Sequence, residues 1–156
     1  MEVHVKVLVL NGPNLNALGT REPDVYGKLT LAQITQRLEE RAARLGCELM
    51  FFQSNSEGAL IDTLYEHAEQ VQGVIINPGA LTHYGLSLHD AFRSVKLPVI
   101  EVHLSNTQAR GGFRERSVIA PVAVGTISGF GWRSYVLALD ALVEILRETW
   151  TFTPTI

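Results

Sequence analysis

Short apolar runs alternate along the chain with longer segments in which apolar residues recur every three or four positions. Five runs have the length and the β-branched composition of strands. They cover residues 3–11, 48–53, 73–79, 97–105 and 120–129. The other segments have the periodicity of amphipathic helices. They cover residues 30–46, 57–71, 84–95 and 131–150.

Polar residues mark where these helices begin and end. Thr30 and Gln33 have the spacing of a capping box, in which each side chain satisfies a free amide at the helix start. Gly46 suits the left-handed position that follows a helix. Ser54 and Glu57 have the same spacing as the first pair, so we expect a second capping box there.

Strands that alternate with helices predict a parallel sheet covered on both faces. The runs "VLVL", "VIIN" and "VAVGTI" are continuously apolar, as expected of strands buried on both sides. The predicted fold is α/β: a flavodoxin-like, doubly wound, five-stranded parallel sheet in a three-layer sandwich. Residues 1–150 are expected to form one domain, and residues 151–156 a C-terminal tail.

Composition and charge exclude several classes of function. The chain has 156 residues and a net charge of −3, and its basic residues form no cluster of the kind that binds nucleic acid. No apolar run approaches the ~20 residues of a membrane span, and the amino end lacks the features of a signal peptide. We therefore expect a cytoplasmic protein. The single cysteine, Cys47, excludes an internal disulfide and a cysteine-rich zinc site, and the histidine spacing predicts no metal site.

In doubly wound sheets, ligands bind outside the carboxyl ends of the strands, so polar side chains at these ends are candidate ligand contacts. Glu101 and His103 are two positions apart on one predicted strand and point to the same face. A carboxylate beside an imidazole fixes its tautomer and favours the protonated ring, which suits a proton donor. A solvated rim at the end of the strand is an equally good interpretation of this pair.

Further polar residues follow the predicted third and fourth strands. Asn77 and His83 bracket a Pro-Gly turn and suit a polyhydroxylated ligand, although a strand cap and a helix start explain them as well. Arg110, Arg114 and Arg116 follow the fourth strand, where an arginine binds carboxylates or hydroxyls. Taken alone, each of the three is better explained as a residue that faces solvent.

The segment "NGPNLNALGTREPDVYG" (11–27) is long for a connection between a strand and a helix. It holds Arg21 and Tyr26 at the expected ligand-binding edge. A guanidinium favours the phenolate form of a nearby tyrosine, which then acts as a base. A lid over a ligand and an exposed turn both fit this composition.

The sequence resembles a known family, the type II 3-dehydroquinate dehydratases. The motifs are "NGPNLNALGTREPDVYG", "QSNSEGALID", "INPGALTH", "IEVHLSN", "ARGGFRERS" and "APVAVGTISGFG", in this order and over nearly the whole chain. The resemblance implies a flavodoxin-like fold, trimers that assemble into a dodecamer, and no cofactor. The implied reaction is the anti elimination of water from 3-dehydroquinate, in aromatic amino acid biosynthesis or in quinate catabolism.

The resemblance also implies roles for individual residues. Tyr26 would be the base that removes a proton at C2, with Arg21 beside it. Asn14 would hold the enolate through a water molecule. His103 would be the acid that protonates the departing hydroxyl, oriented by Glu101. The implied substrate-binding residues are Asn77, His83, Asp90 from a neighbouring subunit, Leu104, Ser105 and Arg114.

Two segments depart from the family pattern. Tyr84-Gly85 replaces a small hydroxyl pair after His83, and Gly111-Gly112 replaces an acidic residue and a proline. The first change is expected to alter the pocket edge or a subunit contact, and the second to loosen the loop that carries Arg114. Two rival functions share the fold: an FMN-binding module, which wants a Ser/Thr-rich phosphate loop after the first strand, and a receiver domain, which wants carboxylates where this chain has Asn11 and Asn77.

Overall fold

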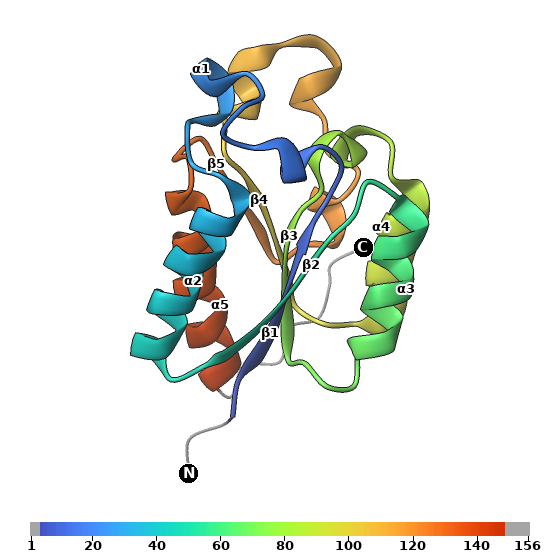
Figure 1. The fold of residues 1–156 in the computed structure, drawn as a ribbon. Coiled ribbons are helices and arrows are strands. Elements are labelled where there is room, and N and C mark those ends of the chain that lie inside the picture. The colour runs from blue at the N-terminus through green and yellow to red at the C-terminus, as the bar shows by residue number, and fades with distance from the viewer. Residues whose placement is uncertain (1–3, 149–156) are drawn as a thin grey trace.

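A computed structural model describes residues 4–148, which form a five-stranded sheet flanked by helices (Figure 1). The strands are β1 (Lys6–Asn11), β2 (Glu48–Gln53), β3 (Gly73–Asn77), β4 (Val99–His103) and β5 (Gly125–Ser128). The α-helices are α1 (Pro23–Tyr26), α2 (Leu31–Leu45), α3 (Glu57–His67), α4 (Leu86–Val95) and α5 (Arg133–Arg147). Short 3-10 helices are η1 (Leu15–Ala17), η2 (Gly79–His83), η3 (Thr107–Arg110), η4 (Gly112–Glu115) and η5 (Ala120–Val122).

The sheet confirms the predicted fold class. Its strands are all parallel and lie in the order β2-β1-β3-β4-β5, which is the doubly wound order of flavodoxin-like proteins. Helices α2 and α5 cover one face of the sheet and α3 and α4 cover the other, to its left and right in Figure 1. The molecule is therefore a three-layer α/β sandwich over its described residues.

Each central strand serves both layers because its side chains alternate in direction. Val7 and Val9 belong to the core under α2 and α5, whereas Leu8 and Leu10 belong to the core under α3 and α4. All four are at most 1% exposed. The continuously apolar β1 thus has the burial that the sequence predicts for a strand with two covered faces.

The predicted capping box at the start of α2 is confirmed, and the second one is wrong. Thr30 and Gln33 exchange side-chain and backbone hydrogen bonds, and Gly46 follows the helix at φ 68°. Helix α3 is instead capped by Ser56, whose hydroxyl accepts the amide N–H of Ala59, while the Ser54 hydroxyl accepts the N–H of Ser56. Ser56 caps the helix because it lies two residues nearer to it than Ser54 and can reach the first-turn amides.

Other predicted bounds shift inward. Helix α3 ends at His67 rather than at residue 71, α4 begins at Leu86 after a 3-10 turn, and β1, β3 and β4 are shorter than expected. The fifth predicted strand is the clearest error, because residues 120–122 form η5 and β5 has only four residues. Gly125 and Thr126 on it are exposed, since β5 is an edge strand and not one buried on both sides.

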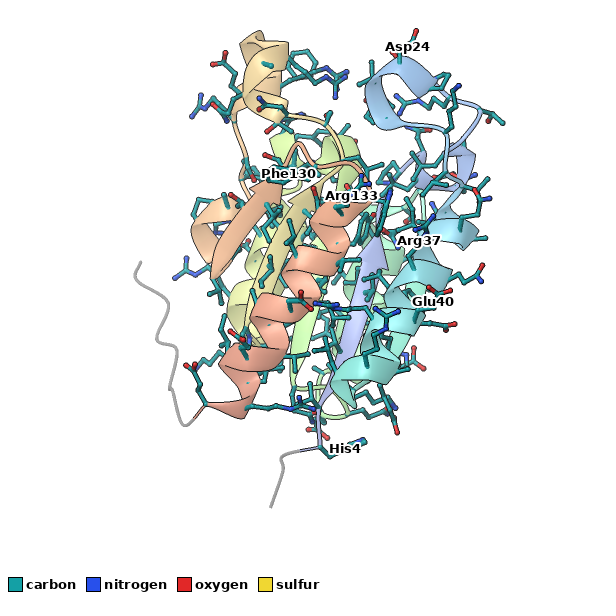
Figure 2. All side chains as sticks on the ribbon, turned by 90° about the vertical axis from the view of Figure 1, so that its left-hand side faces the viewer. His4, Asp24, Arg37, Glu40, Phe130 and Arg133 are labelled. Atoms are coloured by element: carbon teal, nitrogen blue, oxygen red, sulfur yellow. The ribbon has the colours of Figure 1, made fainter. Side chains whose placement is uncertain are left out.

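The connections at the carboxyl ends of the strands gather at one end of the molecule (Figure 1). The loop after β1 carries η1 and α1, and the segment after β4 carries η3 and η4. Figure 2 places Asp24 of α1 at this end and His4, before β1, at the opposite end. Residues 149–156, including the expected tail at 151–156, lie outside the described residues.

Candidate active site

A cavity opens at the carboxyl ends of β1, β3 and β4, where the sheet order predicts a ligand site. Nine of the residues predicted from the sequence and the resemblance line it. They are Asn14, Arg21, Tyr26, Asn77, His83, His103, Leu104, Ser105 and Arg114. The structure thus brings together residues that are spread over a hundred positions of the sequence.

Tyr26 lies at the end of α1, close to two guanidinium groups. The Cζ atom of Arg21 is 5.1 Å from the centre of the Tyr26 ring, and that of Arg110 is 5.3 Å away. Arg110 ends η3 and also lines the cavity. The sequence offered Arg110 as one of three candidate arginines, but it was not among the predicted site residues. Nothing in the neighbouring sequence shows that this part of the chain folds back over Tyr26. The phenol of Tyr26 therefore shares the cavity with two guanidinium groups, of which that of Arg21 also lies 3.5 Å from the Glu22 carboxylate.

His103 and Glu101 form a buried pair at the end of β4. Nε2 of His103 lies 2.5 Å from Oε2 of Glu101, whose side chain is 1% exposed. Burial alone raises the pKa of the Glu101 carboxyl, but the hydrogen bond and charge of His103 and the hydroxyls of Thr82 and Ser117 outweigh it, so that this pKa lies below its usual value. The pair is therefore a largely buried, hydrogen-bonded contact and not a solvated rim.

His83 ends η2 and is held by the segment after η4. Its Nδ1 lies 2.7 Å from the carbonyl oxygen of Arg116, so this nitrogen donates its proton to that oxygen. In the neutral ring Nε2 is consequently an acceptor. The ring also meets the edge of Phe113 at a centroid distance of 5.3 Å. Because His83 lines the cavity, it offers a fixed acceptor to a ligand hydroxyl.

Asn77, at the end of β3, is oriented by a residue that sequence reasoning missed. Its Nδ2 donates to the hydroxyl of Tyr135, and that hydroxyl donates to Oδ1 of Asn11 on the neighbouring strand. The Asn77 Oδ1 accepts the N–H of Gly79. Burial raises the pKa of Tyr135 well above its usual value, which keeps the phenol protonated as this network requires.

Asn14 and Asp90, two further predicted site residues, lie in different parts of the structure. Asn14 precedes η1 with φ 69°, a left-handed conformation that asparagine tolerates better than most residues. Neither Asn14 nor Asp90 was found from the residue pattern, and only the resemblance pointed to them. Asp90 lies exposed on α4 and does not line the cavity of its own chain.

One departure from the family pattern has a structural counterpart. Gly85 precedes α4 and has no side chain to cap it, and the Glu57 carboxylate accepts the N–H of Leu88 at 3.0 Å instead. A Cβ on Gly85 would lie 2.8 Å from the carbonyl oxygen of Leu81 and 3.2 Å from Oε2 of Glu57. A glutamate from α3 therefore supplies a cap at the start of α4.

The second departure lies between two cavity arginines. Gly111 and Gly112 connect Arg110 to the turn that holds Arg114, with φ values of 69° and 61°. Both values are in the region that favours glycine, and an added Cβ would meet open space. The strain of a left-handed backbone, and not crowding, is what makes glycine suitable here.

Over residues 4–148, no three or more His, Cys, Asp or Glu side chains come together in a way that suits a metal ion. Within the same residues, every helix is too short or too polar to cross a membrane.

Comparisons with known proteins point to one family. The family model described as "Dehydroquinase class II" matches residues 5–143. A 3-dehydroquinate dehydratase of Herpetosiphon aurantiacus is 55% identical over 140 residues, which cover 90% of this chain and 97% of the relative. One from Roseiflexus castenholzii is 58% identical and covers 89% of this chain and 88% of the relative.

Solved structures lead to the same group. The crystal structure of a type II dehydroquinase from Butyrivibrio crossotus superimposes with a TM-score of 0.87 at 43% identity, covering 89% of this chain and 97% of the other. A type II dehydroquinase from Propionibacterium acnes gives a TM-score of 0.86 at 40% identity, covering 91% and 99%. The chain therefore belongs to the class II dehydroquinase family.

Proposed function

We propose that this protein is a 3-dehydroquinate dehydratase, which removes water from 3-dehydroquinate by anti elimination and forms 3-dehydroshikimate. The observation that carries this proposal is a single cavity lined by Tyr26, which lies close to two guanidinium groups, and by His103, which is hydrogen-bonded to a buried carboxylate. One group accepts a proton and the other donates one. The relatives named above carry the same activity in their names.

The first step is removal of a proton from C2, next to the ketone, by the Tyr26 phenolate. We assign Arg21 and Arg110, whose guanidinium carbons lie 5.1 Å and 5.3 Å from the centre of the ring, to stabilise the charge that develops in this step. The electrons of the broken C–H bond move to the ketone oxygen and give an enolate. We assign Asn14, which lines the cavity near this loop, to hold the enolate oxygen through a water molecule.

The second step is loss of the C1 hydroxyl. His103 gives it a proton, the C1–O bond breaks, and the enolate collapses to an enone conjugated with the new double bond. Glu101 keeps the ring of His103 in place through the hydrogen bond to Nε2.

Substrate binding is assigned to the rest of the cavity. The carboxylate of the substrate would meet the backbone amides of Leu104 and Ser105 and the side chain of Asn77. The ring hydroxyls would meet the acceptor nitrogen of His83 and the guanidinium of Arg114. Several cationic or donor groups around one cavity suit a polyhydroxylated carboxylate.

The long loop after β1 has a purpose in this scheme. Tyr26 and Arg21 lie in the same connection, together with the short helix α1. An elimination through an enolate benefits from exclusion of water, so we propose that this loop closes over bound substrate as a lid.

We also propose that the enzyme works in the cytoplasm without a cofactor, as trimers assembled into a dodecamer in which Asp90 reaches a neighbour's cavity. The position of Asp90 supports the shared site, because Asp90 is exposed and does not line the cavity of its own chain. The reaction serves aromatic amino acid biosynthesis or quinate breakdown, since both use this step. The flavin-binding alternative is not favoured by the family match.

The test is to add 3-dehydroquinate to the purified protein and follow the ultraviolet absorbance of the conjugated enone. We expect turnover by the wild type and none by Tyr26→Phe, because the variant has no phenolate. Calorimetry should show that the variant still binds substrate. A wild-type protein without turnover, or a purified protein with a flavin spectrum, would overturn the proposal, and substantial turnover by Tyr26→Phe would remove this residue as the base.

A further inference from the structure

The Glu101 carboxylate receives three side-chain hydrogen bonds, two of them from hydroxyl groups to which no role has been assigned above. Ser117 Oγ lies 2.7 Å from Oε1, and Thr82 Oγ1 lies 2.5 Å from Oε2. His103 Nε2 provides the third contact. Thr82 and Ser117 come from η2 and from the segment before η5, so two separate parts of the chain converge on this carboxylate.

Counting hydrogens shows that both hydroxyls are donors to Glu101. The lone pairs of Ser117 Oγ accept the amide N–H groups of Ile119 at 3.0 Å and Ala120 at 2.9 Å. Its own proton is then available only for Oε1 of Glu101. Because the Ser117 lone pairs are occupied, the Thr82 proton goes to Oε2 of Glu101, although Ser117 Oγ is also near at 2.8 Å.

A carboxylate surrounded by three donors is stabilised in its ionised form. The low pKa of Glu101 agrees with this, since the same hydrogen bonds outweigh the effect of burial. The proton in the contact between Glu101 and His103 therefore lies on Nε2 of the ring. Nδ1 has no hydrogen-bond partner among the described residues, and the ring lines the cavity, so Nδ1 is the nitrogen that faces substrate.

We propose that Thr82 and Ser117 are positioning residues for the acid step: their hydroxyls hold Glu101 as an anion and so keep both ring protons on His103. This inference rests on the proposed dehydratase function. In the step itself, Nδ1 gives its proton to the departing hydroxide, which leaves as water. The ring becomes neutral and retains the proton on Nε2. If that proton moved to Glu101 beforehand, Nδ1 would belong to a neutral imidazole, which is a far weaker acid.

Neither residue touches the reacting atoms, because neither lines the cavity that holds Tyr26. Both line a second cavity, which shares His103 with the first and is also lined by Glu101. A backbone bond also joins their segments, from the N–H of Val118 to the carbonyl oxygen of Thr82 at 2.7 Å. This bond should survive loss of the Thr82 hydroxyl, so the hydroxyl can be removed without separating the two segments.

The experiment compares Thr82→Val, which keeps the shape but lacks the hydroxyl, with Thr82→Ser, which keeps the hydroxyl. Dehydration is followed by absorbance, and exchange of the C2 proton with deuterium is followed by NMR. We expect Thr82→Val to lower kcat by about tenfold, a typical effect of losing a hydrogen bond to a charged group. KM should stay within about twofold, because no contact with substrate is lost.

The exchange measurement separates a positioning role from general damage. Tyr26 still forms the enolate in Thr82→Val, so deuterium incorporated per molecule dehydrated should rise as the acid step slows. Thr82→Ser should restore the wild-type ratio. Ser117→Ala should repeat the effect of Thr82→Val at the other oxygen. Thr63→Val is the matched control, since Thr63 is also buried but its hydroxyl bonds to Ala59 on α3.

The outcomes distinguish this inference from the function on which it rests. An inactive wild type would remove the proposed function itself. An active wild type with an unchanged ratio of exchange to dehydration in both Thr82→Val and Ser117→Ala would overturn the positioning role. Equal loss of exchange and dehydration in Thr82→Val would also overturn it, because that result indicates a disturbed fold or base.

Discussion

At the scale of single residues, the site depends on a carboxylate that has only donors around it. The hydrogen bonds of Glu101 keep its pKa below the value of 4.5 that is usual for glutamate, even though burial acts in the opposite direction. The ionised form therefore contributes stability that is fully present above about pH 4.5 and is lost as the pH falls through the lower folded-state pKa.

This dependence can be measured with Glu101→Gln. The amide presents N–H groups to a site that offers only donors, as a protonated carboxyl would present its O–H. We expect the variant to melt below the wild type at pH 7, and the difference between their melting temperatures to shrink as the pH falls below about 4.5. Melting curves recorded from neutral to acid pH give the answer, and a constant difference would contradict the assignment.

The sequence predicted the pairing of Glu101 with His103 because residues two apart on a strand share a face. It could not predict that Tyr135 joins Asn11 and Asn77, since Tyr135 lies 124 positions from Asn11 and its apolar ring fits the buried face of α5 without regard to its hydroxyl. Arg110 was missed for a similar reason. Its contact with Tyr26 depends on how two loops fold over the sheet edge.

At the scale of elements, the start of α4 is secured by its neighbour. The Glu57 carboxylate accepts the N–H of Leu88, one of the first-turn amides that have no partner within the helix. Glu57→Ala should destabilise the protein by about 1 kcal/mol, the usual cost of a lost helix cap. Hydrogen exchange of the Leu88 amide should also become faster. Glu66→Ala on the same helix is the control, because Glu66 is exposed, and equal effects of the two changes would contradict the cap.

The boundaries of α2, α3 and β5 show which features of an element can be predicted from local sequence patterns. Spacing alone cannot show which of two nearby serines, Ser54 or Ser56, caps α3. Glu57 was expected to cap its own helix, whereas its carboxylate accepts an N–H at the start of α4. The long helix α2 was predicted to within one residue at each end because its caps and periodicity agree. The edge strand β5 was overextended, because "VAVGTI" is as apolar as a buried strand although η5 precedes it and its first residues are exposed.

At the scale of the whole molecule, the proposed assembly can be tested by mixing two inactive proteins. Tyr26→Phe lacks the base, and Asp90→Ala is expected to bind substrate poorly while still folding. If Asp90 acts in a neighbour's cavity, mixed oligomers contain cavities with Tyr26 from one chain and Asp90 from the other. We expect mixing after dissociation to restore about a quarter or less of wild-type activity, as random pairing of two subunit types allows.

Light scattering on the same fractions gives the size of the active species, and each variant taken through dissociation alone is the control. Mixtures that stay inactive, or a fully active monomer, would contradict a shared site. The chain's surface is compatible with further contacts, since Tyr84, Leu86, Phe113 and Phe130 are large apolar side chains that are each more than half exposed.

The Tyr135 network has a consequence for the order in which the protein matures. A ribosome makes β1 and β3 early, but the phenol that joins Asn11 to Asn77 arrives only with α5, close to the end of the described chain. Until then both amides lack this partner, and the sheet face that α5 covers is open to water. The Asn77 wall of the cavity therefore reaches its final form only when synthesis is nearly complete, so a growing chain has no finished pocket to expose to substrate.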